Sequence, residues 1–408
     1  MLFFYILVLA APMPNHPLFE ASVLGMSIIK WLGIASCVYA VAQLPSRGKY
    51  FGSSLSAETG AFAVLVGIAA VSYATLSRPE TITFKPMSSY VSYLLLFFIA
   101  ICLVDSPEKL HRTLLVGLVG SAIAALYVIR EYQASGGMQM RPGYIAGDSN
   151  YFATCSLLAI PIGFCFARRE NAPIERALCI VSTIVILVAF TLASSRGGLV
   201  GLCLEIGYMI LRTGKSRRIA ILLGMLLLPA LLFSPVSPLG RMLHPEYGDE
   251  LATQIRRDFW RVGFMLIREH PLTGIGLGNF TAYSFSASPG AAVRHGMACN
   301  TFLEIAAELG VPGFLAYCGL SGAALWSAEK LRSEGKKRKD VLRFYSGEAM
   351  QVGLLGFLGA AMFVSAEYQK PFWVIVALAA ASPSLLTQSP SRSRTVKSVL
   401  VPASSRSV

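Results

Sequence analysis

Apolar runs of about 20 residues recur along most of this chain, and they restrict its fold more than any other feature. Inside a lipid bilayer every backbone amide must be hydrogen-bonded within the protein, so runs of this length must form helices. Only 14% of the residues are charged, whereas an ordinary soluble domain has roughly 25%. The chain is therefore expected to be an all-α, polytopic integral membrane protein.

We expect about 12 transmembrane helices in a single transmembrane domain that covers residues 1–387. The predicted spans are residues 1–13, 21–43, 60–77, 87–104, 113–130, 150–167, 176–193, 197–212, 218–235, 300–327, 347–365 and 371–387. The remaining segment, 388–408, is rich in Ser and Arg, and a disordered cytoplasmic tail is expected there.

Basic residues are divided unequally between the two sets of connecting loops. Most of the 35 lysines and arginines fall in one set, which includes the tail and the run GKKRK at 335–339. The positive-inside rule places this set, and with it both termini, in the cytoplasm. Topology and contact with the lipid bilayer explain the charge of +13, so no nucleic-acid partner is expected.

The connection at residues 236–299 is the one long loop on the opposite, extracytoplasmic side. A structureless loop of this size is unusual unless it has a function. Residues 255–269 have the spacing of an amphipathic helix, with Arg257, Arg261 and Arg268 within about 40° of one another.

Arginine on this side of the membrane is the most informative feature of the loop. Arg256, Arg257 and Arg261 lie in the loop helix, and Arg196 begins a span in the sequence SSRGG. Guanidinium groups bind phosphate in a bidentate manner, and a cluster of them suits a pyrophosphate. Ion pairs with loop carboxylates such as Asp258 are the alternative for any single loop arginine.

A second polar segment, GYIAGDSN at 143–150, directly precedes a span. Asp148 or Ser149 is expected to cap that helix. Asp148 and Asn150 are also candidates for orienting a substrate or a loop arginine.

A third polar segment, 298–313, carries Asn300, Glu304 and Glu308 at a spacing that places them on one helical face. Carboxylates at this depth are costly unless they are paired or functional. Glu304 is therefore a candidate general base or arginine partner, and Asn300 is a candidate for orienting substrate. Pro312 between two glycines is expected to end or kink the helix.

Metal binding is not expected, because the five histidines form no metal-ligand signature. His295 and Cys299 have a spacing of four, but two residues do not make a metal site. His295 is instead a candidate proton acceptor in the long loop at 236–299.

Three segments in order resemble the O-antigen ligase and O-antigen polymerase superfamily of bacterial membrane glycosyltransferases. They are GDSNYFA at 147–153, SSRGG at 194–198, and RRDFWRVGFMLIREHPLTGIGLGNF at 256–280 followed by CNTFLEIAAELGVPGF at 299–314. The resemblance implies a donor glycan on undecaprenyl pyrophosphate, held by arginines that match Arg196 and Arg256. The family usually has His-Asn where this chain has Cys299-Asn300, and cysteine is a poor base at its usual pKa of about 8.5.

The resemblance predicts a metal-independent glycosyltransferase without a cofactor, acting in surface polysaccharide assembly. An acceptor hydroxyl, deprotonated by His295 or Glu304, attacks the anomeric carbon while arginines stabilise the leaving pyrophosphate. A polymerase, with a glycan acceptor, is slightly preferred over a ligase, with a lipid A-core or other acceptor, because the His-Asn pair is missing. The alternatives are a transporter of bicarbonate or of lipid-linked glycan, and a catalytically inactive family member.

Overall fold

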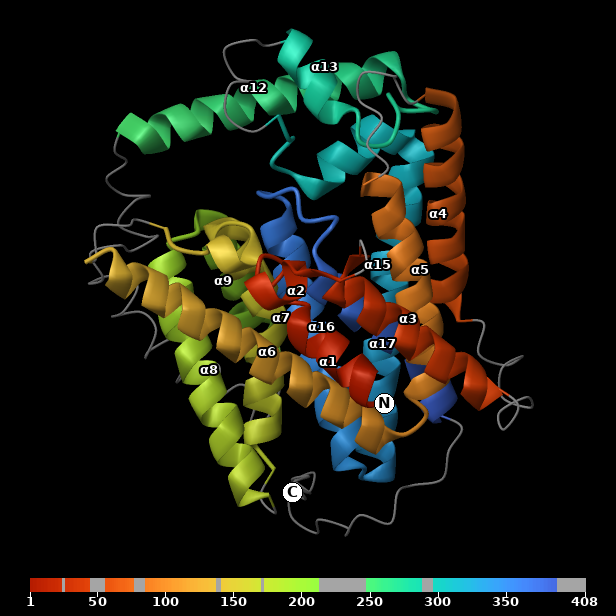
Figure 1. Ribbon diagram of the computed structural model, residues 1–408, viewed down its shortest axis with the longest axis vertical. Helices are drawn as coiled ribbons and strands as arrows, with labels where there is room; N and C mark the ends of the chain where they lie inside the picture. Colours follow the sequence, from red (N-terminus) through yellow and green to blue (C-terminus); the bar gives the residue numbers. More distant parts are fainter. Residues whose placement is uncertain are drawn as a thin grey trace, which may run out of the picture.

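The computed structural model describes residues 1–23, 26–44, 56–76, 85–136, 141–169, 172–212, 247–287 and 296–386. The predicted span 218–235, the tail 388–408, His295 and the start of the long loop lie outside the described residues. The fold is a bundle of helices, with one antiparallel ribbon formed by the strands β1 (Ser22–Val23) and β2 (Met26–Ser27) (Figure 1).

Each predicted span except 218–235 contains a described helix. In chain order the helices are α1 (Leu2–Ala10), α2 (Pro17–Glu20), α3 (Ile28–Gln43), α4 (Ala57–Leu76), α5 (Lys85–Leu103), α6 (Pro107–Ala134), η2 (Tyr144–Ala146), α7 (Ser149–Ala167), α8 (Pro173–Ala193), α9 (Arg196–Leu211), α12 (Tyr247–Glu269), α13 (Phe280–Ala287), α15 (Thr301–Arg338), α16 (Val341–Ala361) and α17 (Lys370–Leu386).

The predicted number of spans is not confirmed. Among the described residues, six helices are long and apolar enough to cross a membrane, namely α4, α5, α6, α7, α8 and α15, and α3 and α17 are shorter apolar helices. The apolar run at 1–13 yields only the nine-residue α1, whose rise of about 13 Å is under half the thickness of a bilayer core. Pro12 and Pro14 follow it, and proline does not continue a helix. The run at 21–43 is shortened because its first residues form the β1–β2 ribbon.

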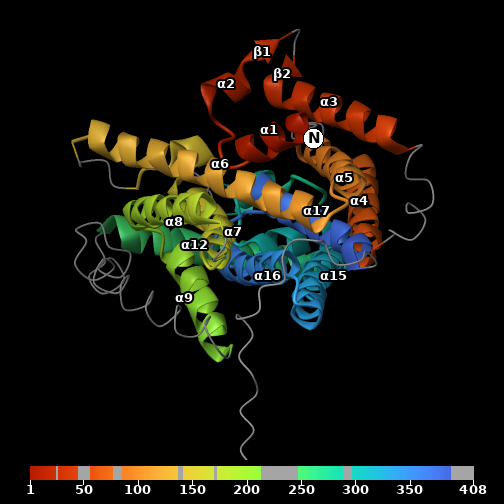
Figure 2. The ribbon, with the colours of Figure 1, turned by 90° about the horizontal axis from the view of Figure 1, so that it is seen from below.

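The centre of the bundle is formed by α7 and α16, which pack on each other and on α8, α9 and α15 (Figure 2). Glycines allow the close approach of these helices. A Cβ at Gly201 of α9 would lie 2.5 Å from the main-chain oxygen of Gly356 of α16. Small residues at helix contacts are typical of membrane bundles, because they let backbones approach each other.

The two ends of the helix bundle carry different polar groups. Arg168 at the end of α7 pairs with Glu348 near the start of α16 (3.1 Å), and Arg212 at the end of α9 pairs with Glu329 of α15 (3.0 Å). Arg168 and Arg212 belong to the set of loops that is rich in basic residues. Both ion pairs lie toward the end of the bundle that is opposite α12. The N-termini of α7, α9 and α15 lie at the opposite end, beneath α12 (Figure 1).

Candidate functional site

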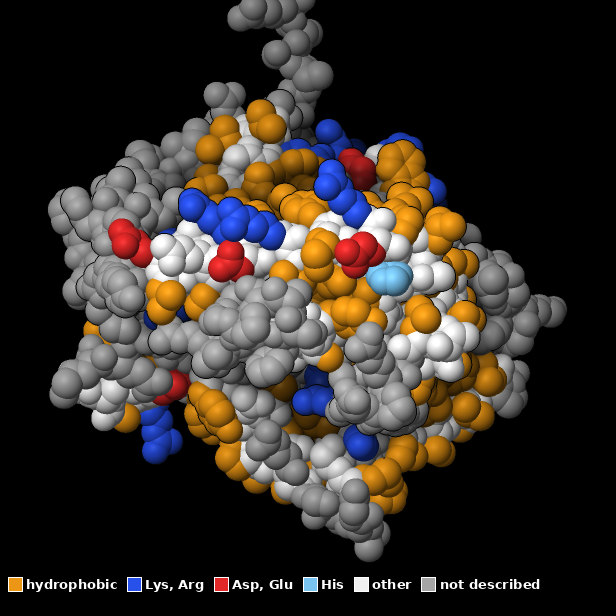
Figure 3. Space-filling model, turned by 90° about the horizontal axis from the view of Figure 1, so that it is seen from above, with side chains coloured by type: hydrophobic (Ala, Val, Ile, Leu, Met, Phe, Trp, Pro, Cys, Tyr) orange, Lys and Arg blue, Asp and Glu red, His pale blue; other side chains and the backbone are white. Residues whose placement is uncertain are grey.

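The long helix α12 lies across one end of the bundle, which confirms the prediction of an amphipathic helix in the loop (Figure 1). Its buried face carries Phe259, Val262 and Leu266. Val262 and Leu266 belong to one apolar cluster with Leu303 and Ala307 in the first part of α15. Because apolar side chains on one face fix the helix to the bundle, its opposite face is exposed. Viewed from this end, Lys and Arg side chains form a row on the surface, and others lie inside a hollow beside that row (Figure 3).

Helix α15 is broken at Gly310, as the glycines around Pro312 predicted. Gly310 has φ 68° and ψ −176°, which is not helical. The rings of Phe302 and Tyr317 are 5.9 Å apart, whereas a straight helix would separate residues 15 positions apart by roughly 22 Å. The amide of Val311 donates to the carbonyl of Pro271 (2.8 Å), so the break is bonded to the end of the loop. Residues 301–309 therefore form a separate short helix at the α12 end.

Glu308 fixes the glycine-rich turn after Pro271 to this short helix. Its carboxylate accepts the amides of Gly278 (2.9 Å) and Phe280 (3.1 Å). The amide of Ile275 donates to the carbonyl of Ala307 (2.9 Å). Glu308 is 6% exposed, and both carboxylate oxygens have a structural partner. Its position on the same face as Glu304 thus has a structural explanation.

Glu304 is also buried, and it connects two segments that border the site. Its Oε2 accepts hydrogen bonds from the amide of Ala298 (3.1 Å) and from the hydroxyl of Ser365. These bonds join the residues before α15 to the connection between α16 and α17. Catalysis by Glu304 stays a prediction, and these contacts favour a structural role.

The two polar segments that precede helices both cap them. Asp148 accepts the amides of Asn150 (2.7 Å) and Tyr151 (2.9 Å), which confirms the expected cap of α7. Asn300 accepts the amides of Phe302 (3.0 Å) and Leu303 (3.1 Å) at the start of α15. Substrate-orienting roles for Asp148 and Asn300 stay predictions.

Asn150 connects the GDSNYFA segment at 147–153 to the SSRGG segment at 194–198. Its Oδ1 accepts hydrogen bonds from the guanidinium of Arg141 (2.9 Å) and from the hydroxyl of Ser195 (3.0 Å). Ser195 in turn caps α9 by accepting the amide of Gly198 (3.2 Å). The segment GDSN therefore holds the N-terminus of α9, where Arg196 is the first residue.

Arg196 and Arg256 lie on the same flank of α12. The guanidinium of Arg196 reaches Thr253 Oγ1 (3.5 Å), and Thr253 precedes Arg256 by one helical turn. Arg256 is half-buried and interacts with the Cys299 side chain. The N-terminus of α9 adds positive potential to the same place. The structure therefore brings together the three motifs that the sequence separated by about 150 residues.

The other two loop arginines point elsewhere. Arg257 is exposed. Arg261 is 82% exposed and pairs with Asp258 at 3.5 Å, as the ion-pair alternative anticipated. An exposed pair of this kind contributes little to stability. Binding of pyrophosphate by Arg257 and Arg261 stays a prediction, and their exposure does not favour it.

Sequence reasoning missed several residues that border the site. Arg141 and Ser195 contact Asn150, Thr253 contacts Arg196, and Glu367 is a buried carboxyl between α16 and α17. Arg141 lies just before the GDSN segment, and its position there was an available signal. Thr253 and Glu367 carry no local pattern, because only the tertiary fold brings them to the site.

Replacing Asn150 with alanine is expected to lower the glycan transfer that the sequence resemblance predicts by about tenfold. The reason is that Arg141 and Ser195 each lose a hydrogen bond to the Asn150 side chain. Asn150→Asp keeps an acceptor oxygen at this position and should retain most of the activity. The measurement is the yield of surface polysaccharide at equal protein level in the membrane. Equal yields from the alanine variant and the wild type would show that the hydrogen bonds of Asn150 to Arg141 and Ser195 are not needed for polysaccharide assembly.

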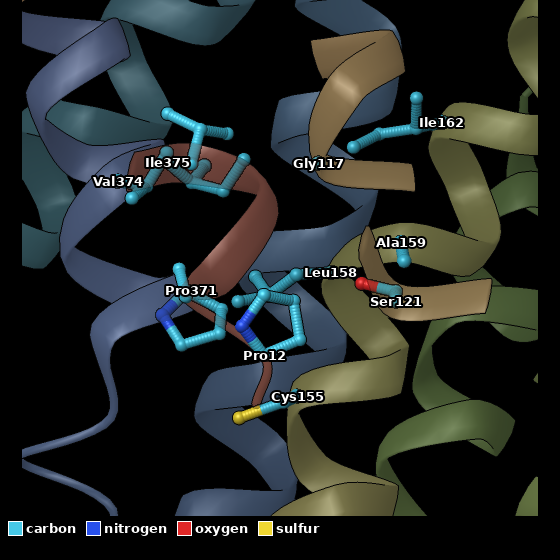
Figure 4. Close-up of a pocket in the computed structure, with 12 residues that line it drawn as sticks. Pro12, Gly117, Ser121, Cys155, Leu158, Ala159, Ile162, Pro371, Val374 and Ile375 are labelled. Atoms are coloured by element: carbon cyan, nitrogen blue, oxygen red, sulfur yellow. The ribbon is translucent and has the colours of Figure 1, made fainter. Parts of the chain in front are cut away.

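A small pocket lies deeper in the bundle, between α1, α6, α7 and α17 (Figure 4). Cys155 on α7, one turn below Tyr151, points into it. Its lining is almost entirely apolar, including Pro12, Leu158, Pro371 and Val374. It therefore lacks the groups that would bind a phosphate or a sugar, and the polar site is at the end of α7 and not in this pocket.

Taken together, these features define a multi-pass membrane protein with an arginine-bearing site at one end of its helix bundle. Residues 181–318 match the family model described as O-antigen ligase. This match confirms the resemblance of the chain to the O-antigen ligase and polymerase superfamily. It includes Arg196, α12 and Glu304, whereas Asn150 and Glu367 lie outside the matched residues. No curated protein matches the chain.

Proposed function

We propose that this protein is a glycosyltransferase that moves a glycan from undecaprenyl pyrophosphate to an acceptor hydroxyl. The family match supports a membrane function of the O-antigen ligase or polymerase type. The observation that carries the finer proposal is the common flank of α12 that holds Arg196 and Arg256, next to Asn150 and Cys299. Two guanidinium groups at one place suit the two phosphates of a polyprenyl pyrophosphate.

In this proposal the reaction takes place at the periplasmic face of the bacterial inner membrane, and both termini are cytoplasmic. The acceptor oxygen attacks the anomeric carbon, and the bond to the pyrophosphate breaks. The leaving pyrophosphate gains negative charge, which Arg196 and Arg256 stabilise by hydrogen bonds that are already oriented. These guanidinium groups supply the positive charge, so the proposal needs no metal ion.

Among acceptors, we prefer a second lipid-linked glycan, which would make the protein a polymerase, over a lipid A-core. This preference rests on Cys299 in the place of the family histidine. Burial raises the pKa of the Cys299 thiol, and Glu304 and Asp148 raise it further, whereas Arg256 opposes the rise. The thiol is therefore protonated at neutral pH and cannot serve as the base.

Replacing Cys299 with serine is accordingly expected to leave the transfer rate within about threefold of the wild type, a change of under 1 kcal/mol. Alkylation of Cys299 should be slow at neutral pH and should accelerate only in alkaline solution, because the thiolate is the reactive form. A serine variant that has lost transfer while it keeps its fold would show that the thiol takes part in the reaction.

The proposed function is tested with purified protein in liposomes that contain a polyprenyl-pyrophosphate-linked glycan. Elongated lipid-linked product would support a polymerase, and product on an added lipid A-core would support a ligase. Accumulation of a solute or of the intact lipid-linked glycan across the membrane, without bond formation, would indicate a transporter. An absence of both glycan transfer and transport would favour an inactive family member.

A further inference from the structure

Glu367 lies in the short connection between α16 and α17 and is the least expected polar group near the site. Its side chain is 2% exposed, and neither carboxyl oxygen has a hydrogen-bond partner on another described residue. Burying a carboxyl without a partner costs several kcal/mol when it is charged, and native structures rarely leave such a group without a reason.

The main chain of the connection that carries Glu367 is held by hydrogen bonds to α15 and α17. The indole of Trp373 donates to the main-chain oxygen of Glu367 (2.7 Å). The hydroxyl of Thr301 donates to the carbonyl of Val364 (2.8 Å) and accepts the amide of Ala366 (2.8 Å). The carboxyl of Glu367, which has no hydrogen-bond partner among the described residues, is thus held beside the start of α15.

The groups that interact electrostatically with Glu367 among the described residues are acidic or phenolic. They are Tyr90 and Tyr93 of α5, Tyr151 of α7, Glu304, Glu308 and Tyr317 of α15, and the neighbouring Tyr368. Tyr151 follows Asn150 in α7, and its hydroxyl donates to the sulfur of Met297 (3.4 Å), two residues before Cys299. Tyr151 therefore connects this group to the arginine-bearing site. The hydroxyl of Tyr317 is buried and has no described partner either.

Among the three carboxyls, Glu367 alone has both oxygens without a described partner. Glu308 uses both of its oxygens to hold the glycine-rich turn, and Oε2 of Glu304 accepts two hydrogen bonds. Burial raises the pKa of the Glu367 carboxyl well above its usual range, and the charges of Glu304 and Glu308 raise it further. A raised pKa is what a carboxyl needs to act as a base near neutral pH.

We propose that Glu367 is a further catalytic residue of the proposed transfer and accepts the proton of the attacking hydroxyl. The acceptor enters beside Tyr151, between Glu367 and the two arginines. Its O–H bond breaks as its oxygen bonds to the anomeric carbon, and the proton passes to Glu367. The bond from that carbon to the pyrophosphate breaks, and the pyrophosphate leaves with the electron pair. This inference rests on the proposed function.

The test compares Glu367→Gln with Glu205→Gln in liposomes that contain lipid-linked glycan. Glu205 is an equally buried carboxyl on α9 that packs against Gly356, and its Oε1 has no hydrogen-bond partner among the described residues. Glu367→Gln should lower single-turnover transfer by about 100-fold or more, the usual contribution of a general base. Binding of the lipid-linked donor should not change, and Glu205→Gln should transfer at the wild-type rate.

The pH profile separates catalysis from a structural role. The wild-type rate should rise with pH, because Glu367 becomes ionised as the pH passes its raised pKa, and the residual rate of Glu367→Gln should lack this rise. Should the glutamine variant fail to fold, Glu367→Asp is used, and its profile should have a shifted midpoint. Wild-type rate in Glu367→Gln, or an unshifted profile in either variant, would overturn the assignment. A wild-type protein that transfers no glycan would instead remove the proposed function.

Discussion

Replacing Arg196 or Arg256 with alanine is expected to lower glycan transfer by about 10²–10³-fold, the usual cost of removing one preorganised donor from a developing negative charge. Each substitution removes a guanidinium group from the flank of α12 where the pyrophosphate is proposed to bind. The measurement is single-turnover transfer in liposomes at saturating donor. Arg196→Lys should recover only part of the loss, because an ammonium group keeps the charge without the bidentate geometry.

Arg261→Ala is the matched control, because this arginine is on the same helix but is 82% exposed. Its effect should stay within about twofold, as for a surface substitution. Equal losses from Arg261→Ala and Arg256→Ala would mean that the helix contributes only a general positive charge. Unchanged transfer in Arg196→Ala would contradict the proposed site.

Replacing Gly310 with valine is expected to have the largest effect on stability. The φ and ψ of this residue fall in a region that is essentially restricted to glycine. A Cβ there would also lie 2.6 Å from the carbonyl oxygen of Leu272 and 2.9 Å from that of Pro271. The variant should therefore lose the docking of the loop on α15, with a cost of about 3 kcal/mol or more. The measurement is the melting temperature of the purified protein in detergent.

Gly319→Ala provides the control on the same helix, since nothing lies within 4 Å of a Cβ at this position. It should leave the melting temperature unchanged or slightly raised, because alanine favours a helix over glycine. A Gly310→Val protein with the melting temperature of the wild type would show that the break of α15 at Gly310 is not needed for stability.

Much of the bundle could be predicted from the sequence, because hydropathy determines which segments can lie in lipid. The predicted limits of α4 to α8 agree with the structure within a few residues, apart from α6, which is longer at both ends. The break of α15 and the amphipathic α12 were also predictable, since glycine beside proline and a periodic apolar face are local signals. The span predicted at residues 1–13 is not confirmed, because α1 has only nine residues and prolines follow it.

The site was predicted only in part. The order of the motifs indicated Arg196 and Arg256. Periodicity placed Arg257 and Arg261 on one face of the loop helix, but it did not show that this face is the exposed one and that Arg256 lies near Cys299. Glu304 was considered a base because a buried carboxylate near the membrane is costly unless it is paired or functional. The sequence could not show that Ala298 and Ser365 donate hydrogen bonds to it. Glu367 carried no signal, because its burial depends on the packing of α5, α7 and α15.

A double-mutant cycle on Arg196 and Arg256 tests the shared pyrophosphate site most directly. Affinity for a polyprenyl pyrophosphate is measured in the wild type, in Arg196→Ala, in Arg256→Ala and in the double variant. The two residues are predicted to be coupled, so that the loss in the double variant differs from the sum of the single losses by about 0.5–3 kcal/mol. Losses that simply add, or affinities that none of the variants changes, would show that the two arginines do not hold one pyrophosphate.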